Sequence, residues 1–200
     1  IGCDIYTGAA RFVSAHCIQV DDIELYAKRF VIATGSFARI PDMEGIQSVD
    51  YLTNEDMFSL ETRPEHLLIS GAGPVGVEMA QAYARLGSRV SLIEQAQRIL
   101  PRFDRDISRQ LKKQLLADGV NIVHGAVERV QQQGDVRTLV LDDGRELSGD
   151  QLLVAVGRRP AIEALGLEKA GVDFGENGIM VNARMQTSRR HIFACGDVTG

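Results

Sequence analysis

Apolar residues along the middle of the chain follow spacings that predict a strand, a helix and a second strand in succession. Residues 67–70 form a short, uninterrupted apolar run, which is typical of a strand buried on both faces. Residues 89–94 (R-V-S-L-I-E) are expected to form the second strand. Between them, apolar side chains recur at helical spacing before Gly87, which is expected to end the helix; they are Val75, Met79, Tyr83 and Leu86.

A second helix and a third strand are expected next. The helix covers 104–118, with Asp104 as its N-cap and Gly119 at its end. One face of this helix carries three apolar residues, Ile107, Leu111 and Leu115. Residues 120–124 then form an apolar strand. This alternation of strands and helices predicts an α/β fold with a doubly wound parallel sheet and right-handed connections.

Shorter runs with β-rich or alternating character flank this unit. Before it, four runs predict an antiparallel meander: residues 3–6, 10–13, 17–20 and 23–26. After it, residues 126–150 predict a small antiparallel insert with glycine-containing turns. Residues 54–60 are expected to form one or two helical turns, capped by Thr53 or Asn54.

Three further apolar runs, 29–36, 151–157 and 192–197, predict buried strands that end in glycine-containing turns. The first two end alike, as F-V-I-A-T-G and L-L-V-A-V-G, and each follows an antiparallel stretch. This quasi-repeat predicts two similar nucleotide-binding units, one of them incomplete. Cys195, in the third run, is interpreted as a small core residue and not as a reactive thiol.

Composition and charge narrow the function classes. The chain has 200 residues and a net charge of −5, so we expect no nucleic-acid or membrane partner. Its apolar runs are too short to span a bilayer. Three sparse cysteines favour a reducing compartment such as the cytoplasm, and four scattered histidines argue against a metal site. Residue 1 is Ile, so we expect a piece of a longer protein.

The turn between the first strand and helix carries a recognisable chemical pattern. G-x-G-x-x-G falls on Gly71, Gly73 and Gly76. In a dinucleotide site the first glycine permits the tight turn, and the second lets the backbone approach the pyrophosphate. The third lets helix and strand pack closely, with the helix N-terminus facing the anion. The pattern alone is weak evidence for such a site.

Glu94 strengthens this interpretation because it ends the next strand, 18 residues after Gly76. An acidic side chain there can bind the ribose hydroxyls of NAD and repel the 2′-phosphate of NADP. A solvated strand-end acid is the alternative. Arg98 lies nearby and could weaken the preference for NAD.

Two further acidic residues remain open between structural and functional roles. Glu78 is placed in the first turn of the helix, where it would either offset the helix dipole or lie near the nicotinamide. Asp197 follows Gly196 at the end of a buried strand. It is either a turn residue or an acid that hydrogen-bonds a chain of sugar-like hydroxyls.

Five motifs in one order resemble the pyridine nucleotide-disulfide oxidoreductases. They are A-T-G-S at 33–36 followed by Pro41, the glycine motif at 71–80, Glu94 with R-I-L-P at 98–101, V-G-R-R-P at 156–160, and A-C-G-D at 194–197. The resemblance covers essentially the whole chain and is greatest to dihydrolipoamide dehydrogenases and mercuric reductases. It implies FAD/NAD(P)-binding, Rossmann-like three-layer ββα architecture, with a partial second, FAD-type domain.

The resemblance also implies site residues. On the NAD side, Glu94 would hold the adenine ribose, Val127 would touch the adenine, and Gly157 would lie near the nicotinamide. The pyrophosphate and nicotinamide side would be lined by Gly71, Gly73, Pro74, Val75, Gly76 and Glu78, and the resemblance favours the functional role of Glu78. On the FAD side, Asp197 would bind the ribitol chain, together with Ala10, Thr34 and Gly35.

Several family features are missing from this sequence. The first G-x-G-x-x-G, the C-x-x-x-x-C redox pair, the lysine that partners the Glu78 position, and the C-terminal His-Glu pair do not occur in it. We therefore expect no catalytic residue in this chain and interpret it as the central part of such an enzyme. Residues 1–40 and 159–200 would be remnants of the FAD and central domains, and 41–158 the NAD-binding domain.

The implied function is hydride transfer between NADH and FAD, feeding a cysteine disulfide in the whole protein. NAD(H) is expected to be preferred over NADP(H), FAD to be the second cofactor, and the whole protein to be a homodimer acting on a small-molecule or disulfide substrate. Two alternatives stay open. The chain could be an NAD-binding module without turnover, or part of an NADH oxidase or flavin reductase of the same superfamily.

Overall fold

The computed structural model describes residues 2–200 and shows two compact units. One consists of Ala38–Gly157, and the other combines Ile1–Phe37 with Arg158–Gly200, so the second is formed by both ends of the chain. The predicted mixed α/β fold with a parallel sheet is confirmed. The assignment of the two units to an NAD-type and an FAD-type domain stays a prediction.

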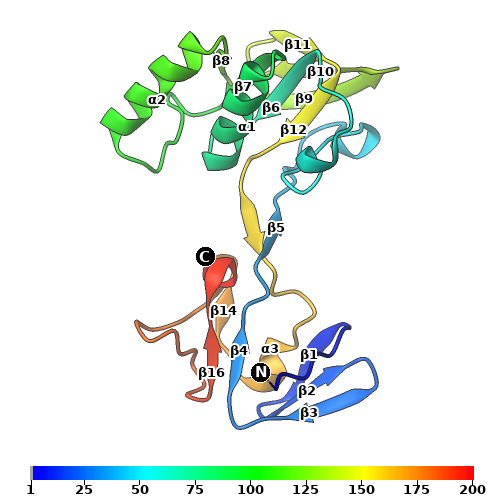
Figure 1. Cartoon of the computed structure of the whole chain (residues 1–200), viewed down its shortest axis with the longest axis vertical. Helices are drawn as coiled ribbons and strands as arrows, with labels where there is room; N and C mark the ends of the chain where they lie inside the picture. Colours follow the sequence, from blue (N-terminus) through cyan, green and yellow to red (C-terminus); the bar gives the residue numbers. More distant parts are fainter. Residues whose placement is uncertain (1) are drawn as a thin grey trace. The chain divides into compact units, whose positions relative to one another are not determined.

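Unit Ala38–Gly157 is built on a four-stranded parallel sheet (Figure 1). The strands stand in the order β12 (Gln151–Val154), β6 (His66–Ser70), β7 (Arg89–Glu94) and β8 (Asn121–His124). Helix α1 (Pro74–Arg85) joins β6 to β7, and α2 (Arg105–Ala117) joins β7 to β8. The strand order reverses beside β6, with β7 on one side and β12 on the other. In open α/β sheets, ligands bind at the carboxyl ends of the strands at such a point.

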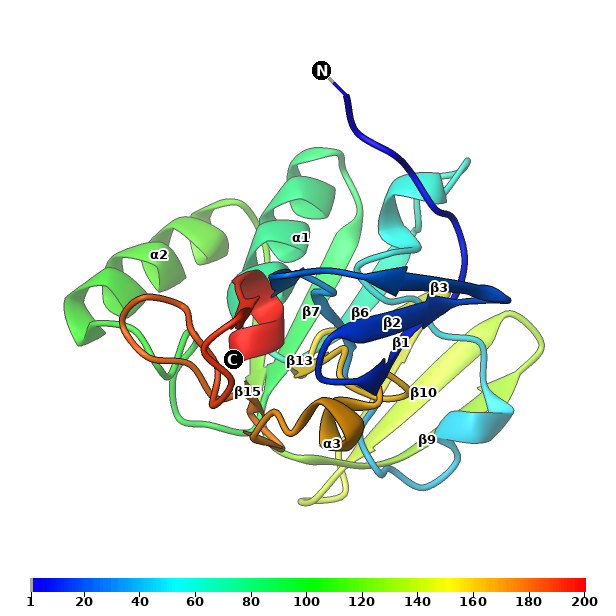
Figure 2. The same ribbon diagram turned by 90° about the horizontal axis from the view of Figure 1, so that it is seen from below.

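Successive side chains of the sheet point into two different cores, which explains the uninterrupted apolar runs. Leu67 and Ile69 pack in the core that includes Val77 and Ala80 of α1, whereas Leu68 packs in the core on the opposite face. Figure 2 shows α1 and α2 on one side of β6 and β7, with β9 and β10 on the other.

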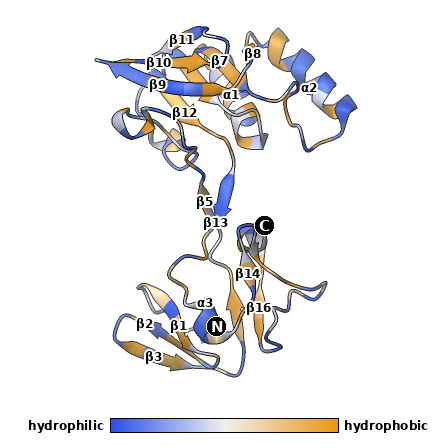
Figure 3. Cartoon of the chain, turned by 180° about the vertical axis from the view of Figure 1, so that it is seen from behind, coloured by the Kyte–Doolittle hydropathy of each residue, from blue (hydrophilic) through white to orange (hydrophobic). Residues whose placement is uncertain are grey.

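The second face of the parallel sheet is covered by the predicted antiparallel insert. It contains β9 (Val127–Gln133), β10 (Val136–Leu141) and β11 (Glu146–Gly149), with β10 in the middle. A 3₁₀ turn, η1 (Ile46–Ser48), contributes the buried Ile46 to this core. The contrast between apolar β12 and the polar carboxyl end of β9 is visible in Figure 3.

The helices form where predicted, but each turns a slightly different face to the core. Asp104 caps α2, since its Oδ1 accepts a hydrogen bond from the Asp106 amide at 2.7 Å. Ile107 is 54% exposed, and Ser108 takes the buried place because its hydroxyl donates to the Ile99 carbonyl. In α1, Leu86 is 65% exposed because the helix ends at Arg85. Ile107 and Leu86 therefore add no buried side chain to the core.

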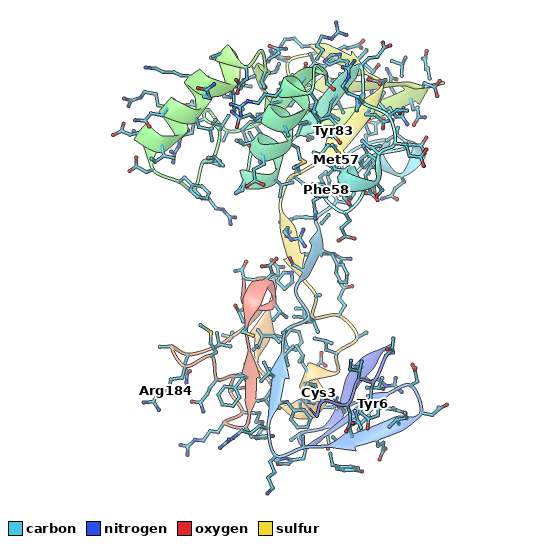
Figure 4. The ribbon with its side chains drawn as sticks, viewed as in Figure 1. Cys3, Tyr6, Met57, Phe58, Tyr83 and Arg184 are labelled. Carbon is cyan, nitrogen blue, oxygen red and sulfur yellow. The ribbon has the colours of Figure 1, made fainter. Side chains whose placement is uncertain are left out.

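The expected helical turns within 54–60 reduce to one 3₁₀ turn, η2 (Met57–Ser59), with Asp56 as its N-cap. Met57 is buried against the core of α1, and its carbonyl oxygen accepts a hydrogen bond from the Tyr83 hydroxyl at 2.9 Å. Phe58 is exposed instead. Figure 4 labels these three side chains between α1 and η2.

The other unit begins with the predicted meander, β1 (Ala10–Ser14), β2 (Cys17–Val20) and β3 (Ile23–Tyr26), whose strands pair antiparallel. A separate parallel pair joins β4 (Phe30–Ile32) to β16 (Ile192–Ala194). The small α3 (Leu167–Ala170) packs its buried residues with Phe12 and Phe30 in a third core. The remaining elements are β5 (Ser36–Ala38) paired with β13 (Arg158–Pro160), β14 (Phe174–Gly175) paired with β15 (Gly178–Ile179), and η3 (Gly196–Thr199).

Three expectations for this unit are wrong. Residues 3–6 form no strand, because the pairing partner of β1 is β2 and the described residues offer 3–6 no neighbouring strand. Val31 is 67% exposed, so β4 is covered on one face only by the described residues. Cys195 is exposed and not a core residue, because β16 ends at Ala194 and only its backbone amide continues the pairing, to the Ile32 carbonyl.

Candidate functional site

The glycine-rich turn joins the carboxyl end of β6 to the start of α1, and backbone hydrogen bonds hold it in place. The Gly71 amide donates to the carbonyl oxygen of Ile93 at 2.8 Å. The carbonyl oxygen of Ala72 accepts from the Leu100 amide, also at 2.8 Å. Both bonds come from β7 or the segment that follows it, so the turn is fixed by the neighbouring strand.

The three glycines of the motif are needed for different reasons. Gly71 has φ +104°, and a Cβ there would press against the backbone of Ala155. A Cβ on Gly76 would collide with the carbonyl oxygen of Gly71. A Cβ on Gly73 would meet no described heavy atom within 4 Å, and its φ of −72° suits any residue. Backbone conformation and packing within the protein therefore account for Gly71 and Gly76, but they do not account for Gly73.

The start of α1 offers unpaired backbone donors without a competing charge. Gly73 is the N-cap, and Pro74 occupies the first turn without an N–H of its own. The other amides of residues 75–76 point out of the helix end, where the helix dipole favours an anion. The first turn is uncharged. Glu78 is exposed and lies beyond that turn, so its expected place in the first turn is wrong.

Glu94 is buried at the end of β7, with 8% of its surface exposed. Its Oε2 accepts a hydrogen bond from the Ala72 amide at 2.9 Å, within the glycine turn. Its Oε1 accepts from the Ala96 amide at 2.9 Å. A carboxylate has about four acceptor positions, so two remain after these bonds. Glu94 thus fixes the glycine turn to the loop after β7, and we call this pair of hydrogen bonds the Glu94 clamp. The carboxylate also remains available as an acceptor.

Arg98 is held within its own loop. Its guanidinium donates to the carbonyl oxygen of Phe103 at 2.8 Å and to that of Pro101. These bonds direct the cation toward the loop backbone. They reduce its capacity to pair with a phosphate beside Glu94.

The other predicted NAD residues surround the same end of the sheet. Gly157 follows β12 with φ +129°, and a Cβ there would meet none of the described atoms within 4 Å. Val127 begins β9 and is half-buried. The segment before it is tied to β7, because the Gly125 amide donates to the backbone carbonyl of Glu94 at 3.1 Å. All predicted NAD residues belong to one unit: Gly71, Gly73, Pro74, Val75, Gly76, Glu78, Glu94, Val127 and Gly157.

The predicted FAD residues belong to the other unit. Ala10 is exposed at the start of β1. Thr34 donates its hydroxyl to the carbonyl oxygen of Ala161 at 2.8 Å, and Gly35 beside it has φ +72°. Asp197 is exposed in η3. These placements leave backbone and carboxylate groups open on the surface of the unit.

Two residues that sequence reasoning did not single out hold Asp197. Its Oδ2 accepts a hydrogen bond from the Ser36 hydroxyl at 2.7 Å and pairs with the Arg158 guanidinium at 3.4 Å. Arg158 also donates to the Ser36 hydroxyl and carbonyl oxygens at 2.6 Å. The quasi-repeat could have indicated both residues, because Ser36 and Arg158 directly follow its two final glycines, Gly35 and Gly157.

A histidine with a shifted pKa lies at the opposite, amino end of the parallel sheet. His66 begins β6, and its Nε2 lies 2.9 Å from the Ser91 hydroxyl. Burial lowers the pKa of the His66 imidazole, and the nearby Arg89 charge lowers it further. Because it lies away from the glycine turn, we assign it to stability.

Within residues 2–200, no cluster of three or more His, Cys, Asp and Glu side chains has the arrangement of a metal site. None of the helices in that range is both long and apolar enough to traverse a bilayer.

Comparison with known proteins matches residues 2–200 to the family described as pyridine nucleotide-disulphide oxidoreductase. Mercuric reductase of Lysinibacillus sphaericus is 40% identical over 201 residues, which cover 98% of this chain and 37% of that protein. Dihydrolipoyl dehydrogenase of Bacillus subtilis is 42% identical over 153 residues, covering 74% of this chain and 33% of that protein.

A solved structure extends this similarity to the fold. The HOCl-induced flavoprotein disulfide reductase RclA from Escherichia coli matches with a TM-score of 0.91 and 34% identity, over 98% of this chain and 46% of that chain. The present chain therefore spans less than half the length of each of these three relatives.

Proposed function

Because the chain belongs to the pyridine nucleotide-disulphide oxidoreductase family, we propose that residues 38–157 bind NADH within a larger FAD-dependent oxidoreductase. When both groups are bound, NADH supplies a hydride, FAD accepts it, and the two electrons reduce a cysteine disulfide. We place that disulfide in the part of the whole protein that this sequence does not contain. The similarity to mercuric reductase and dihydrolipoyl dehydrogenase supports the proposal.

The observation that carries the NADH site is Gly73. Neither backbone conformation nor packing within the described residues requires a glycine there. A bound pyrophosphate supplies a reason, since it would approach the backbone where a side chain would stand. The uncharged start of α1 favours an anion in the same place.

Glu94 supports a preference for NADH over NADPH. Its carboxylate is anchored by the amides of Ala72 and Ala96 and keeps acceptor positions for ribose hydroxyls. A 2′-phosphate would meet this negative charge, while the nearby Arg98 is engaged with its own loop. Val127 and Gly157 would lie at the adenine and nicotinamide ends.

On the flavin side we propose that Asp197 hydrogen-bonds the ribitol hydroxyls of FAD, with Ala10, Thr34 and Gly35 lining the same cofactor. Ser36 and Arg158 engage Oδ2 of Asp197 and so orient the carboxylate. A homodimer, a disulfide or small-molecule substrate and a cytoplasmic location are part of the same proposal for the whole protein, and rest on the family resemblance and cysteine usage.

The test compares NADH binding by the wild-type chain with that of Gly73→Ala. We expect the variant to keep its melting temperature, because the added methyl group contacts no described atom, and to bind NADH at least about tenfold more weakly. Gly175→Ala is a matched control, since a Cβ there also meets nothing within 4 Å. Equal NADH affinity in wild type and Gly73→Ala would refute the proposed site.

A further inference from the structure

The imidazole of His124 connects α2 to the segment that follows β7. His124 is the last residue of β8, and its Nδ1 lies 2.8 Å from the carbonyl oxygen of Ala96. On the other side of the ring, Nε2 lies 3.3 Å from Nζ of Lys112 in α2. The histidine therefore lies between a helix of the helical layer and the loop that carries the Glu94 clamp.

These two partners determine the tautomer of the ring. A carbonyl oxygen only accepts hydrogen bonds, so Nδ1 of His124 must carry the proton and donate to Ala96. An ammonium group only donates, so Nε2 must be the unprotonated nitrogen that accepts from Lys112. Each contact thus selects the same neutral imidazole, and the ring is fixed in one orientation.

The contacts continue from His124 to the glycine turn. Ala96, whose carbonyl oxygen accepts from His124, donates its amide to Oε1 of Glu94 at 2.9 Å. Oε2 of Glu94 accepts from the Ala72 amide. A continuous series of hydrogen bonds therefore runs from Lys112 through His124, Ala96 and Glu94 to the turn.

We infer that His124, oriented by Lys112, is a positioning residue for the adenosine end of the NADH site, acting by holding the Ala96 peptide and hence the Glu94 carboxylate. The inference rests on the proposed NADH function of Glu94. It adds two residues, in β8 and α2, whose side-chain hydrogen bonds go to each other and to Ala96 and not to the glycine turn. Loss of the His124–Ala96 bond frees the loop, and Glu94 then loses orientation toward the ribose.

A purely structural role for His124 predicts a different outcome from a positioning role. A structural defect weakens every ligand of the unit alike. A positioning defect weakens NADH, whose adenosine ribose lies at Glu94, but leaves reduced nicotinamide mononucleotide unaffected because that molecule lacks the adenosine.

The experiment titrates the full chain and its variants with both ligands. His124→Asn places a donor near the position of Nδ1. His124→Gln places a donor near the position of Nε2 and leaves the carbonyl oxygen of Ala96 without its donor. We expect His124→Asn to bind NADH within about twofold of wild type and His124→Gln to bind it about three- to tenfold more weakly. Neither variant should change the affinity for reduced nicotinamide mononucleotide.

Lys112→Met and its exposed neighbour Lys113→Met form a second matched pair. We expect Lys112→Met to weaken NADH binding by about two- to fivefold and Lys113→Met to leave it unchanged. This pair decides the inference if a His124 variant fails to fold, as monitored by circular dichroism.

Wild-type NADH affinity in both His124→Gln and Lys112→Met would overturn the inference and leave the NADH site intact. Equal weakening of the two ligands would overturn it in favour of a structural role. Failure of the wild-type chain to bind NADH would instead refute the proposed function, and the inference with it.

Discussion

At the residue scale, Glu94 combines a structural and a proposed binding role. Its two carboxylate oxygens accept backbone amides from both sides, Ala72 in the glycine turn and Ala96 in the following loop. Because Glu94 is only 8% exposed, water does not easily replace its carboxylate as the acceptor of these amides. We therefore expect substitution of Glu94 to affect the shape of the turn and the proposed preference for NADH together.

Glu94→Arg separates these two effects. We expect the ratio of NADPH to NADH affinity to rise, because a cation replaces the charge that repels the 2′-phosphate. We also expect the free energy of unfolding to fall by about 1–3 kcal/mol, because one buried and one half-buried amide lose their acceptor. Ligand titrations and urea unfolding measure the two outcomes. An unchanged cofactor ratio would show that Glu94 does not face the ribose.

His66 gives a prediction for the pH dependence of stability. Its pKa is lowered in the folded chain, from about 6.5 in the unfolded chain. The contribution of neutral His66 to the free energy of unfolding is therefore fully present above pH about 6.5. It is lost as the pH falls through the folded-state pKa, because the unfolded chain binds the proton more readily. His66→Gln keeps a polar amide toward Ser91 but does not titrate.

Urea unfolding at pH 7.5 and pH 5 compares the two proteins. The wild type is expected to lose more free energy of unfolding between these pH values than His66→Gln. The same loss in both proteins would exclude His66 as the source.

At the element scale, the sequence predicted the parallel strands and both helices because their signals are local. The apolar run 67–70, the cap Asp104 and the terminating Gly87 each act within a few residues. The errors depend on contacts and strand ends that only the folded chain shows. Ser108 is buried because the Ile99 carbonyl accepts its hydroxyl, and Cys195 is exposed because β16 ends before it. The pattern of apolar and polar residues alone indicates neither the burial of Ser108 nor the exposure of Cys195.

The candidate site follows the same division. The glycine motif and Glu94 could be recognised from their spacing, although their contacts with a cofactor stay a prediction. Ser36 lies more than 100 residues before its partners Arg158 and Asp197, so only the folded chain brings this network together. The clamp of Glu94 on Ala72 is likewise invisible in the sequence.

The antiparallel insert depends on one buried cation. Arg137 of β10 is 7% exposed and donates to the carbonyl oxygens of Asp50, Asp135 and Asp150. We expect Arg137→Met to lower the free energy of unfolding by about 2–4 kcal/mol, because these carbonyl groups lose a charged donor. Arg129→Met, at an exposed position of the neighbouring β9, is the control and should change it by about 0.5 kcal/mol or less. Equal effects in the two variants would contradict this role.

At the scale of the whole molecule, the division into two units separates the proposed cofactor contacts. The residues proposed for NAD lie in Ala38–Gly157, and those proposed for FAD lie in the unit formed by both chain ends. The G-x-G-x-x-G pattern occurs once in the sequence, in the first of these units. We therefore expect the NADH site to be the more complete of the two within this chain, which spans less than half of its relatives.

A crystal structure of the chain grown with NADH tests the central claim most directly. The account predicts the pyrophosphate at the start of α1 against the backbone of Gly73, with the adenosine ribose hydroxyls within hydrogen-bonding distance of Glu94. NADH bound elsewhere on the chain, or a Glu94 carboxylate turned away from the ribose, would contradict it.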